Sequence, residues 1–241
     1  MPKSLAIETS GRIGSVALAL EGRVIAESEF PHGLKHAAGI VPMIDSLCRQ
    51  QGWSAKDFQE IYVSAGPGSF TGLRIGITLA KTLAFATGAK IVAVPSVRVL
   101  VENAPAEAQH VIIVLDAKRE QIFTARFQRE GDCWLERETA HLDSLAAMLA
   151  RSPRPVYLLG EGIPYHQKFI PPDDESVKTT GQATWQARAS VVAKIGTEMA
   201  RAGEFADPYQ LTPIYIRVPG AEEKRLAAEE AARKAALRER G

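Results

Sequence analysis

The chain has 241 residues, 46% of them apolar, and its 29 lysines and arginines offset 28 aspartates and glutamates to a formal charge of +1. This length allows a substantial core in one domain or two small ones, and the balanced charge excludes a strongly basic surface that would grip nucleic acid unaided. Two cysteines, Cys48 and Cys133, make neither a zinc set nor a disulfide framework. Without a signal peptide or a membrane-spanning apolar run, we expect a soluble, cytoplasmic protein.

The first residues predict three strands, at 4–8, 15–20 and 23–29, joined by a polar turn and a Glu21-Gly22 hairpin. A strand that ends in an acidic residue and runs into Thr9-Ser10-Gly11 resembles the opening of actin-like ATPases, where such a hairpin touches phosphate. Glu8 stands where that superfamily usually has aspartate, which makes it a candidate metal or water contact. The alternative, which we favour, is a strand-end carboxylate that faces solvent or caps the turn.

The next segment, residues 36–51, predicts a helix because Ile40, Met43, Ile44, Leu47 and Cys48 recur at helical spacing. His32 and His36 lie four residues apart and in principle face one metal ion. Pro31 and Gly33 place His32 before the helix, however, so we favour a helix-entry or interface role over a ligand role.

A glycine-rich loop, residues 64–76, joins a predicted strand at 60–63 to a long apolar helix that ends near Ala86. Ser69 or Thr71 can cap that helix. The loop lacks the Gly-Lys-Ser/Thr of a Walker A motif and the glycine order of a Rossmann fingerprint. Two readings stay open: an anion site at a helix N-terminus, or a corner that lets the helix pack closely. The candidate phosphate-loop residues are Glu8, Thr9, Ser10, Gly66, Gly68, Ser69, Thr71 and Gly72.

Beyond the glycine-rich loop, strand-like and helix-like segments alternate, which predicts parallel strands with right-handed crossovers. We expect a strand at 91–94, a short helix at 96–103, a link at 105–109 and a second lobe that starts with the strand 111–115. Asp116-Ala117-Lys118-Arg119-Glu120-Gln121 then stands where an actin-like fold places its second phosphate hairpin. It contains no glycine, so side chains would fill the space that a phosphate needs.

The remaining elements are expected as a strand at 121–127, a helix at 142–151, a strand at 156–159 before Gly160-Glu161-Gly162, a loop-rich stretch at 168–184, and a helix at 185–202 that returns to the first lobe. We expect residues 208–217 to be extended and residues 221–240 to form a charged helix with a thin apolar stripe. The predicted domains are therefore 1–105 completed by 186–219, a reduced second lobe at 106–185, and a C-terminal extension at 220–241.

These motifs together resemble the TsaB (YeaZ) family, the short actin-like partner in bacterial threonylcarbamoyladenosine modification of tRNA. The resemblance rests above all on the string from Gly66 to Gly76. It extends through Ala6-Ile7-Glu8-Thr9-Ser10, Lys35-His36, Asp116–Arg119, Gly160–Gly162 and Pro213–Arg217. Glu8 for aspartate, and Ala37 where the family often has serine, are departures. The resemblance implies a two-lobed α/β fold of the actin-like ATPase type with a degenerate nucleotide and metal site.

The longer relative in this superfamily, TsaD, carries the transferase chemistry and holds a metal with two histidines after the strand that follows the glycine loop. Anchored on that strand, this chain has Ser96 and Leu100 at those positions, and neither suits a transition metal. The five histidines (His32, His36, His110, His141 and His166) make no coherent ligand set. We therefore expect no catalytic residue, no metal and no cofactor.

The resemblance implies a non-catalytic partner of TsaD, needed for the modification of position 37 of tRNA. The alternatives are an actin-like phosphotransferase, a metallopeptidase-like hydrolase, and a nucleotide-binding regulator. Surplus apolar residues on the two first-lobe helices predict the contact surface: His36, Ile40, Met43, Ile44, Leu47, Leu73, Arg74, Ile77 and Ala80. The expected partners are a TsaD-like subunit on this face, a second copy of the chain in its absence, a TsaE-like ATPase, and tRNA only through the complex.

Overall fold

The first five strands form a sheet in the order β3-β2-β1-β4-β5 in the computed structural model, which describes residues 2–31 and 36–217. β1 pairs antiparallel with β2 and parallel with β4, and β4 pairs parallel with β5. This arrangement follows from the tight Glu21-Gly22 turn, which allows a hairpin, and from the helical crossover after β4. The strands are β1 (Lys3–Glu8), β2 (Ile13–Leu20), β3 (Arg23–Pro31), β4 (Glu60–Gly66) and β5 (Lys90–Pro95).

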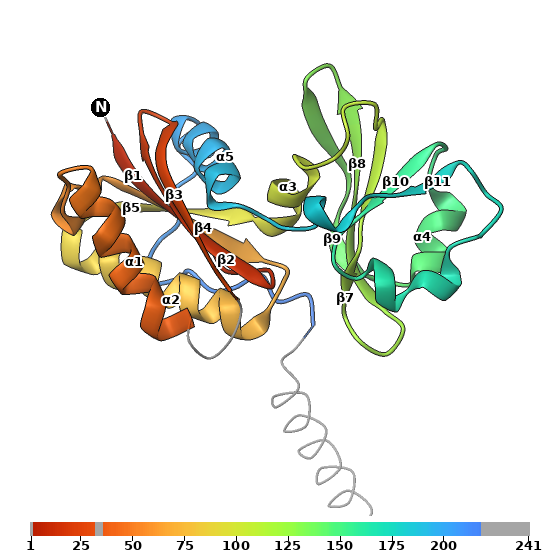
Figure 1. The fold of residues 1–241 in the computed structure, drawn as a ribbon, viewed down its shortest axis with the longest axis horizontal. Helices are drawn as coiled ribbons and strands as arrows, with labels where there is room; N and C mark the ends of the chain where they lie inside the picture. Colours follow the sequence, from red (N-terminus) through yellow and green to blue (C-terminus); the bar gives the residue numbers. More distant parts are fainter. Residues whose placement is uncertain (1, 32–35, 218–241) are drawn as a thin grey trace, which may run out of the picture.

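Helices cover both faces of this first sheet (Figure 1). α1 (His36–Gln50) and α2 (Phe70–Thr87) lie on one face, and α5 (Ala189–Arg201) lies on the other. α2 begins after the N-cap Ser69 and ends at Gly88, which adopts the left-handed conformation with φ 79°. The apolar sides of α1 and α2 pack on the sheet as one core cluster that includes Leu5, Ile7, Ile40, Leu47 and Ile77.

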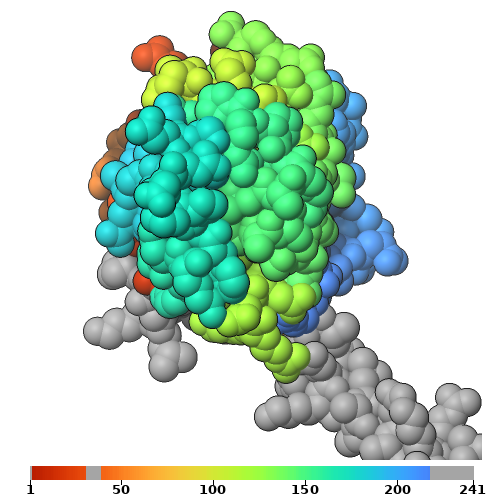
Figure 2. Space-filling view, turned by 90° about the vertical axis from the view of Figure 1, so that its right-hand side faces the viewer, coloured from red at the N-terminus to blue at the C-terminus, as the bar shows by residue number. Residues whose placement is uncertain are grey.

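The second sheet has the order β11-β10-β6-β8-β7, and β9 pairs with β8. Its strands are β6 (His110–Ile113), β7 (Leu115–Asp116), β8 (Ile122–Glu130), β9 (Cys133–Asp143), β10 (Val156–Leu159) and β11 (Val177–Thr179). α4 (Leu145–Arg151) packs on one face through Leu145, Met148 and Leu149. Figure 2 shows the outer surface of this lobe, formed mostly by the green to teal segments between β8 and α5.

The inner faces of the two sheets share a single apolar core. It joins Tyr62 and Val94 of the first sheet to Val111 and Leu159 of the second, with the short helix α3 (Ser96–Val101) between them. One-turn 3-10 helices complete the fold: η1 (Ala55–Asp57), η2 (Ile163–Tyr165), η3 (Gln167–Phe169) and η4 (Gln182–Thr184). The two sheets are thus joined by packing as well as by the chain.

The predicted two-lobed α/β fold of actin-like type is confirmed, and the helix expected at 185–202 does return to the first sheet, although it begins only at Ala189. The 11-residue strand β9 was not predicted, and it takes the first residues of the helix expected at 142–151. A short strand, β11, lies in the stretch expected to be loop-rich. The divisions at 105 and 185 stay predictions. The helix expected at 221–240 lies outside the described residues, as does His32.

Candidate functional site

The glycine-rich loop forms a tight corner between β4 and α2. The Ser69 hydroxyl accepts a hydrogen bond from Gly72 N at 3.2 Å, which makes Ser69 the N-cap of α2. Ser69 N in turn donates to the carbonyl of Ser10 at 2.7 Å, so the corner is fastened to the turn after β1. Thr71 is exposed on the first turn of the helix. Of the two capping residues considered from sequence, Ser69 therefore has the role.

The glycines of this corner make room for the neighbouring protein backbone. A Cβ at Gly72 would lie 1.9 Å from the carbonyl oxygen of Thr9, and one at Gly68 would lie 2.5 Å from that of Ser10. Contacts under 3.0 Å are essentially never seen for a Cβ atom. The Thr9-Ser10 turn thus occupies the space beside the helix N-terminus. Of the two readings left open by the sequence, this geometry favours the close-packed corner over the anion site.

Glu8 ends β1 beneath this corner and is completely buried, with 0% of its surface exposed. Its carboxylate accepts hydrogen bonds from Ser10 N at 2.5 Å and Ser10 Oγ at 2.6 Å, and also from the hydroxyl of Ser64. Burial, partly offset by these donors, raises the pKa of Glu8. Of the two roles favoured from sequence, Glu8 therefore has the second: it caps the turn and does not face solvent, because Ser64 of β4 lies against it.

Ser96 and Leu100, which stand after β5 where TsaD holds its metal, both have packing roles. Ser96 is buried, and its hydroxyl accepts a hydrogen bond from Gly66 N at 3.2 Å, which ties α3 to the glycine corner. Leu100 is buried in the core between the sheets. Within residues 2–31 and 36–217, no group of three or more histidine, cysteine, aspartate or glutamate side chains is placed to hold a metal ion.

The second hairpin, between β7 and β8, is closed without glycine. Lys118, Arg119 and Glu120 all adopt positive φ, at 62°, 54° and 60°, a region that side chains other than glycine seldom occupy. The guanidinium of Arg217 donates to the carbonyl of Ala117 and to the side chain of Gln121. The C-terminal segment therefore braces this hairpin, and side chains lie where the actin-like pattern has glycines.

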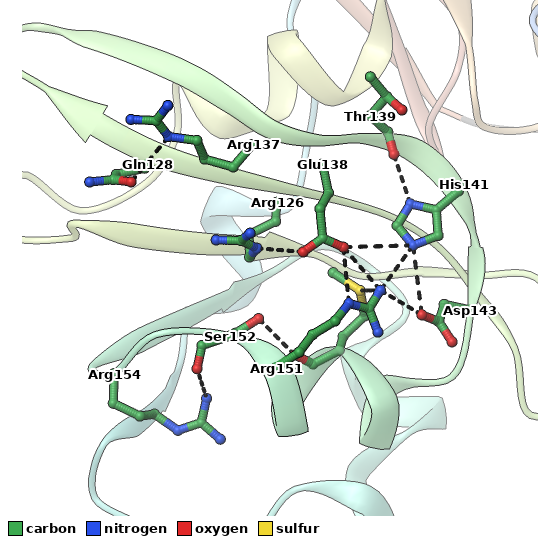
Figure 3. A network of polar contacts seen from close by, with 11 residues as sticks. Arg126, Gln128, Arg137, Glu138, Thr139, His141, Asp143, Arg151, Ser152 and Arg154 are labelled. Carbon is green, nitrogen blue, oxygen red and sulfur yellow. Dashed lines mark hydrogen bonds and ion pairs between the residues drawn. The ribbon is translucent and has the colours of Figure 1, made fainter.

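Two of the described histidines contact acidic side chains of the second lobe. His166 Nε2 lies 3.2 Å from Asp116 Oδ1. His141 belongs to the network of Figure 3, where Arg151 Nη2 lies 2.6 Å from Asp143, 3.0 Å from Glu138 and 3.2 Å from His141 Nε2. The network fastens β9 to α4, and the arginine occupies the point on which the three side chains converge.

The apolar face of α1 and α2 divides into a buried and an exposed part. Six of the residues predicted at the partner surface are buried in the core: Ile40, Ile44, Leu47, Leu73, Ile77 and Ala80. Met43 is half-buried against the same core, and Arg74 is exposed. The side chain of His36 lies outside the described part of the chain. Most of the apolar residues predicted at the partner surface therefore pack against the sheet, because they face inward on both helices.

The outward side of the two helices carries apolar residues that are not among the nine predicted at the contact surface. Val41 is 53% exposed, and Leu79 and Leu83 are partly exposed beside it. Two adjoining hollows of about 430 Å³ and 390 Å³ lie here, and both are lined by Val41 and Leu79. We call this surface the α1–α2 groove. Helical spacing from the buried positions identifies these residues only once the sheet-facing side is known.

An aromatic cluster borders the groove at the start of α2. Arg74 lies 3.9 Å from the ring centre of Phe70, and its Nε donates to Tyr215 Oη at 2.9 Å. Tyr215 belongs to the C-terminal segment, which is held along the corner by the hydrogen bond from Ile214 N to Ala65 O at 2.7 Å.

Among the helices of residues 2–31 and 36–217, none has the length and apolar character that a membrane-spanning helix requires.

Comparison with known proteins identifies the family. The family model described as "TsaD: tRNA N6-adenosine threonylcarbamoyltransferase" matches residues 33–233. The tRNA threonylcarbamoyladenosine biosynthesis protein TsaB of Bacillus subtilis is 34% identical over 228 residues, which are 91% of this chain and 96% of that protein. TsaB of Escherichia coli is also 34% identical, over 56% of this chain and 59% of its own.

The fold agrees with these matches. The solved structure of YeaZ from Pseudomonas aeruginosa superimposes with a TM-score of 0.75 at 24% identity, and the match covers 89% of this chain and 100% of that one. The chain therefore belongs to the TsaB (YeaZ) family.

Proposed function

We propose that this chain works in the biosynthesis of N6-threonylcarbamoyladenosine in tRNA, as the non-catalytic partner of a TsaD-like transferase in the cytoplasm. The observation that carries the proposal is the similarity, along 91% of the chain, to TsaB of Bacillus subtilis, a tRNA threonylcarbamoyladenosine biosynthesis protein. The match to the TsaD family model supports a partner of the same fold.

The geometry of the glycine corner supports the non-catalytic part. The Thr9-Ser10 turn fills the space beside the N-terminus of α2, and the Glu8 carboxylate is fully buried beneath three hydrogen-bond donors. A general base or a metal ligand must reach the substrate or ion that it serves. Glu8 and Ser96, both buried in packing roles, support a structural function for this region.

The α1–α2 groove is the surface we propose for the partner. It is apolar and hollowed, and it is formed by two neighbouring helices, which can pack against a second helix pair. A four-helix contact of this type buries on the order of 1,600 Å² in total. In isolation a second copy of the chain would occupy the same face. A TsaE-like ATPase and tRNA would be reached through the complex.

The experiment pairs two substitutions on α1. Val41→Asp places a charge in the α1–α2 groove, whereas Ser46→Asp places the same charge on an exposed position of α1 that does not line either hollow. Each variant is co-purified with a TsaD-like subunit, and threonylcarbamoyladenosine is measured in tRNA from cells that depend on the variant. We expect Val41→Asp to lose both the partner and the modified nucleoside, and Ser46→Asp to retain both.

Met43 is a poorer probe than the sequence suggested. Met43→Asp would place the charge against the core of the first sheet, where Met43 packs, so it would disturb the fold as well as the surface. Undiminished partner binding by Val41→Asp would place the interface elsewhere. ATP or peptide turnover by the purified chain, lost in Ser96→Ala, would instead favour a phosphotransferase or a hydrolase.

A further inference from the structure

Arg74 is an exposed cation in the α1–α2 groove, one helical turn after the start of α2. It lines the hollow of about 390 Å³ together with apolar residues such as Ile75 and Leu79. A partner that covers this hollow removes water from the guanidinium, and a charge that loses water without gaining an opposite charge is costly. The apolar character of the groove therefore does not by itself describe the partner, which must also answer the charge of Arg74.

The guanidinium of Arg74 is held in one orientation by two aromatic side chains. Its central carbon lies 3.9 Å from the ring centre of Phe70, and its Nε donates to Tyr215 Oη at 2.9 Å. The two rings lie against each other, with their centres 5.2 Å apart. A cation–π contact together with a hydrogen bond fixes both the plane and the direction of the group. Arg74 therefore loses little side-chain entropy when a partner binds it.

Tyr215 is fixed in turn by the backbone on which it stands. Ile214 N donates to Ala65 O at 2.7 Å, and the side chain of Arg217 donates to the hairpin between β7 and β8. A Cβ at Gly66 would lie 3.0 Å from the carbonyl oxygen of Ile214, so the segment lies directly against the glycine corner. The hydroxyl that orients the guanidinium is thus placed by contacts on both sides of the tyrosine.

The two Nη groups of Arg74 have no partner. Within residues 2–31 and 36–217 they make no hydrogen bond and no ion pair. Among the described residues that line the two hollows, the other charged one is Asp45, which already pairs with Arg49 at 2.9 Å. The groove therefore carries one uncompensated positive charge. Its two free N–H-bearing nitrogens form the planar fork that a carboxylate accepts through both of its oxygens.

We propose, on the basis of the proposed function, that Arg74 determines the specificity of the α1–α2 groove by binding a carboxylate of the TsaD-like subunit, from an aspartate or glutamate on the helix that docks there. A carboxylate is favoured over an RNA phosphate, because no second basic residue lines either hollow in the described part of the chain. Sites for nucleic acid gather several cations. Phe70 and Tyr215 are positioning residues, which hold the guanidinium in the orientation that the carboxylate meets.

The test measures binding of the full chain to a purified TsaD-like subunit by calorimetry, at increasing salt concentration. The variants are Arg74→Gln, Arg74→Lys and Tyr215→Phe. Arg201→Gln is the matched control, because Arg201 is also exposed but belongs to α5 on the other face of the first sheet. A gel-shift assay with tRNA in place of the subunit tests the phosphate alternative.

We expect Arg74→Gln to weaken binding of the subunit about tenfold or more and Arg201→Gln to leave it unchanged. Arg74→Lys keeps the charge but not the fork, so it should weaken binding at least about threefold. The affinity of the native chain should fall with salt more steeply than that of Arg74→Gln. Tyr215→Phe should weaken binding about threefold and, in ¹⁵N NMR spectra of the free chain, shift the Nε–H signal of Arg74, which a general loosening of the fold would not do selectively.

The outcomes separate this contact from the proposed function. Unchanged binding by Arg74→Gln, with binding lost in Val41→Asp, would overturn the carboxylate contact and leave the proposed function standing. A native chain that does not bind the subunit would overturn both. Binding of tRNA by the chain alone that is lost in Arg74→Gln would make a phosphate the ligand and would also overturn the proposal.

Discussion

Replacing Gly72 by alanine should separate the two readings of the glycine corner by their opposite effects on stability. The new Cβ would lie 1.9 Å from Thr9 O, so the Thr9-Ser10 turn or the start of α2 must move by more than an ångström. Forced overpacking of this kind costs about 1–3 kcal/mol or more. Alanine regains up to about 1 kcal/mol as a better helix former. We therefore expect a net loss of about 2 kcal/mol in the free energy of unfolding.

Gly39 provides the matched control, because it lies inside α1 and a Cβ built there meets nothing within 4 Å. Gly39→Ala should raise the free energy of unfolding by about 0.5–1 kcal/mol. Urea unfolding followed by circular dichroism, at several protein concentrations, measures both variants. With a slope of about 2–3 kcal/mol per molar urea, the two midpoints should differ by about 1 M. A Gly72→Ala protein as stable as Gly39→Ala would refute the close-packed corner and restore the anion-site reading.

Three further predictions concern the core and the junction of the lobes. Because its pKa is raised on folding, Glu8 contributes fully to stability below about pH 4.5, and this contribution is lost as pH rises through the folded-state pKa. The free energy of unfolding of Glu8→Gln, measured by urea titration relative to the native chain, should therefore improve between pH 4 and pH 8. A difference in unfolding free energy that stays constant over this range would contradict the raised pKa. Burial and the hydrogen bond to Glu60 raise the pKa of Tyr62 to about 12, so spectrophotometric titration should find a late tyrosine ionisation near pH 12, and Tyr62→Phe should remove that late step. Asn103→Ala should lower the free energy of unfolding by about 1–3 kcal/mol, because it deprives the carbonyls of Thr184 and Gln186 of their donor; unchanged thermal unfolding would show that water replaces the amide.

The sequence predicted the first sheet well because its strands are short apolar runs between strong turn signals. Residues 4–8 and 91–94 lie inside observed strands, and Ser69 caps α2 as one of the two residues expected. β9 could not be predicted in this way. Its residues, Cys133–Asp143, mix charges with apolar side chains without alternation, because the strand lies at a sheet edge and is stabilised by ion pairs such as Arg126–Glu138 at 2.7 Å.

The candidate site was predicted in part. Periodicity identifies an apolar face on α1 and α2, but it does not say which residues the sheet covers. Ile44 and Val41 are both apolar and only three residues apart, yet one is buried and the other exposed. Likewise the burial of Glu8 depends on Ser64, a residue 56 positions away in the chain. Contacts of this kind are set by tertiary packing, which local patterns do not contain.

The apolar core shared by the two sheets has a consequence for how the molecule meets other molecules. Lobes that open and close around a ligand need an interface that separates and reforms at little cost. Here, separation would expose the apolar side chains of α3, among them Val97, Val99 and Leu100, which pack between the two sheets, at about 25 cal/mol for each Å² of apolar surface. The relative orientation of the lobes is therefore settled on folding. A partner that docks on this chain therefore loses less conformational entropy than one that must first order two separate lobes.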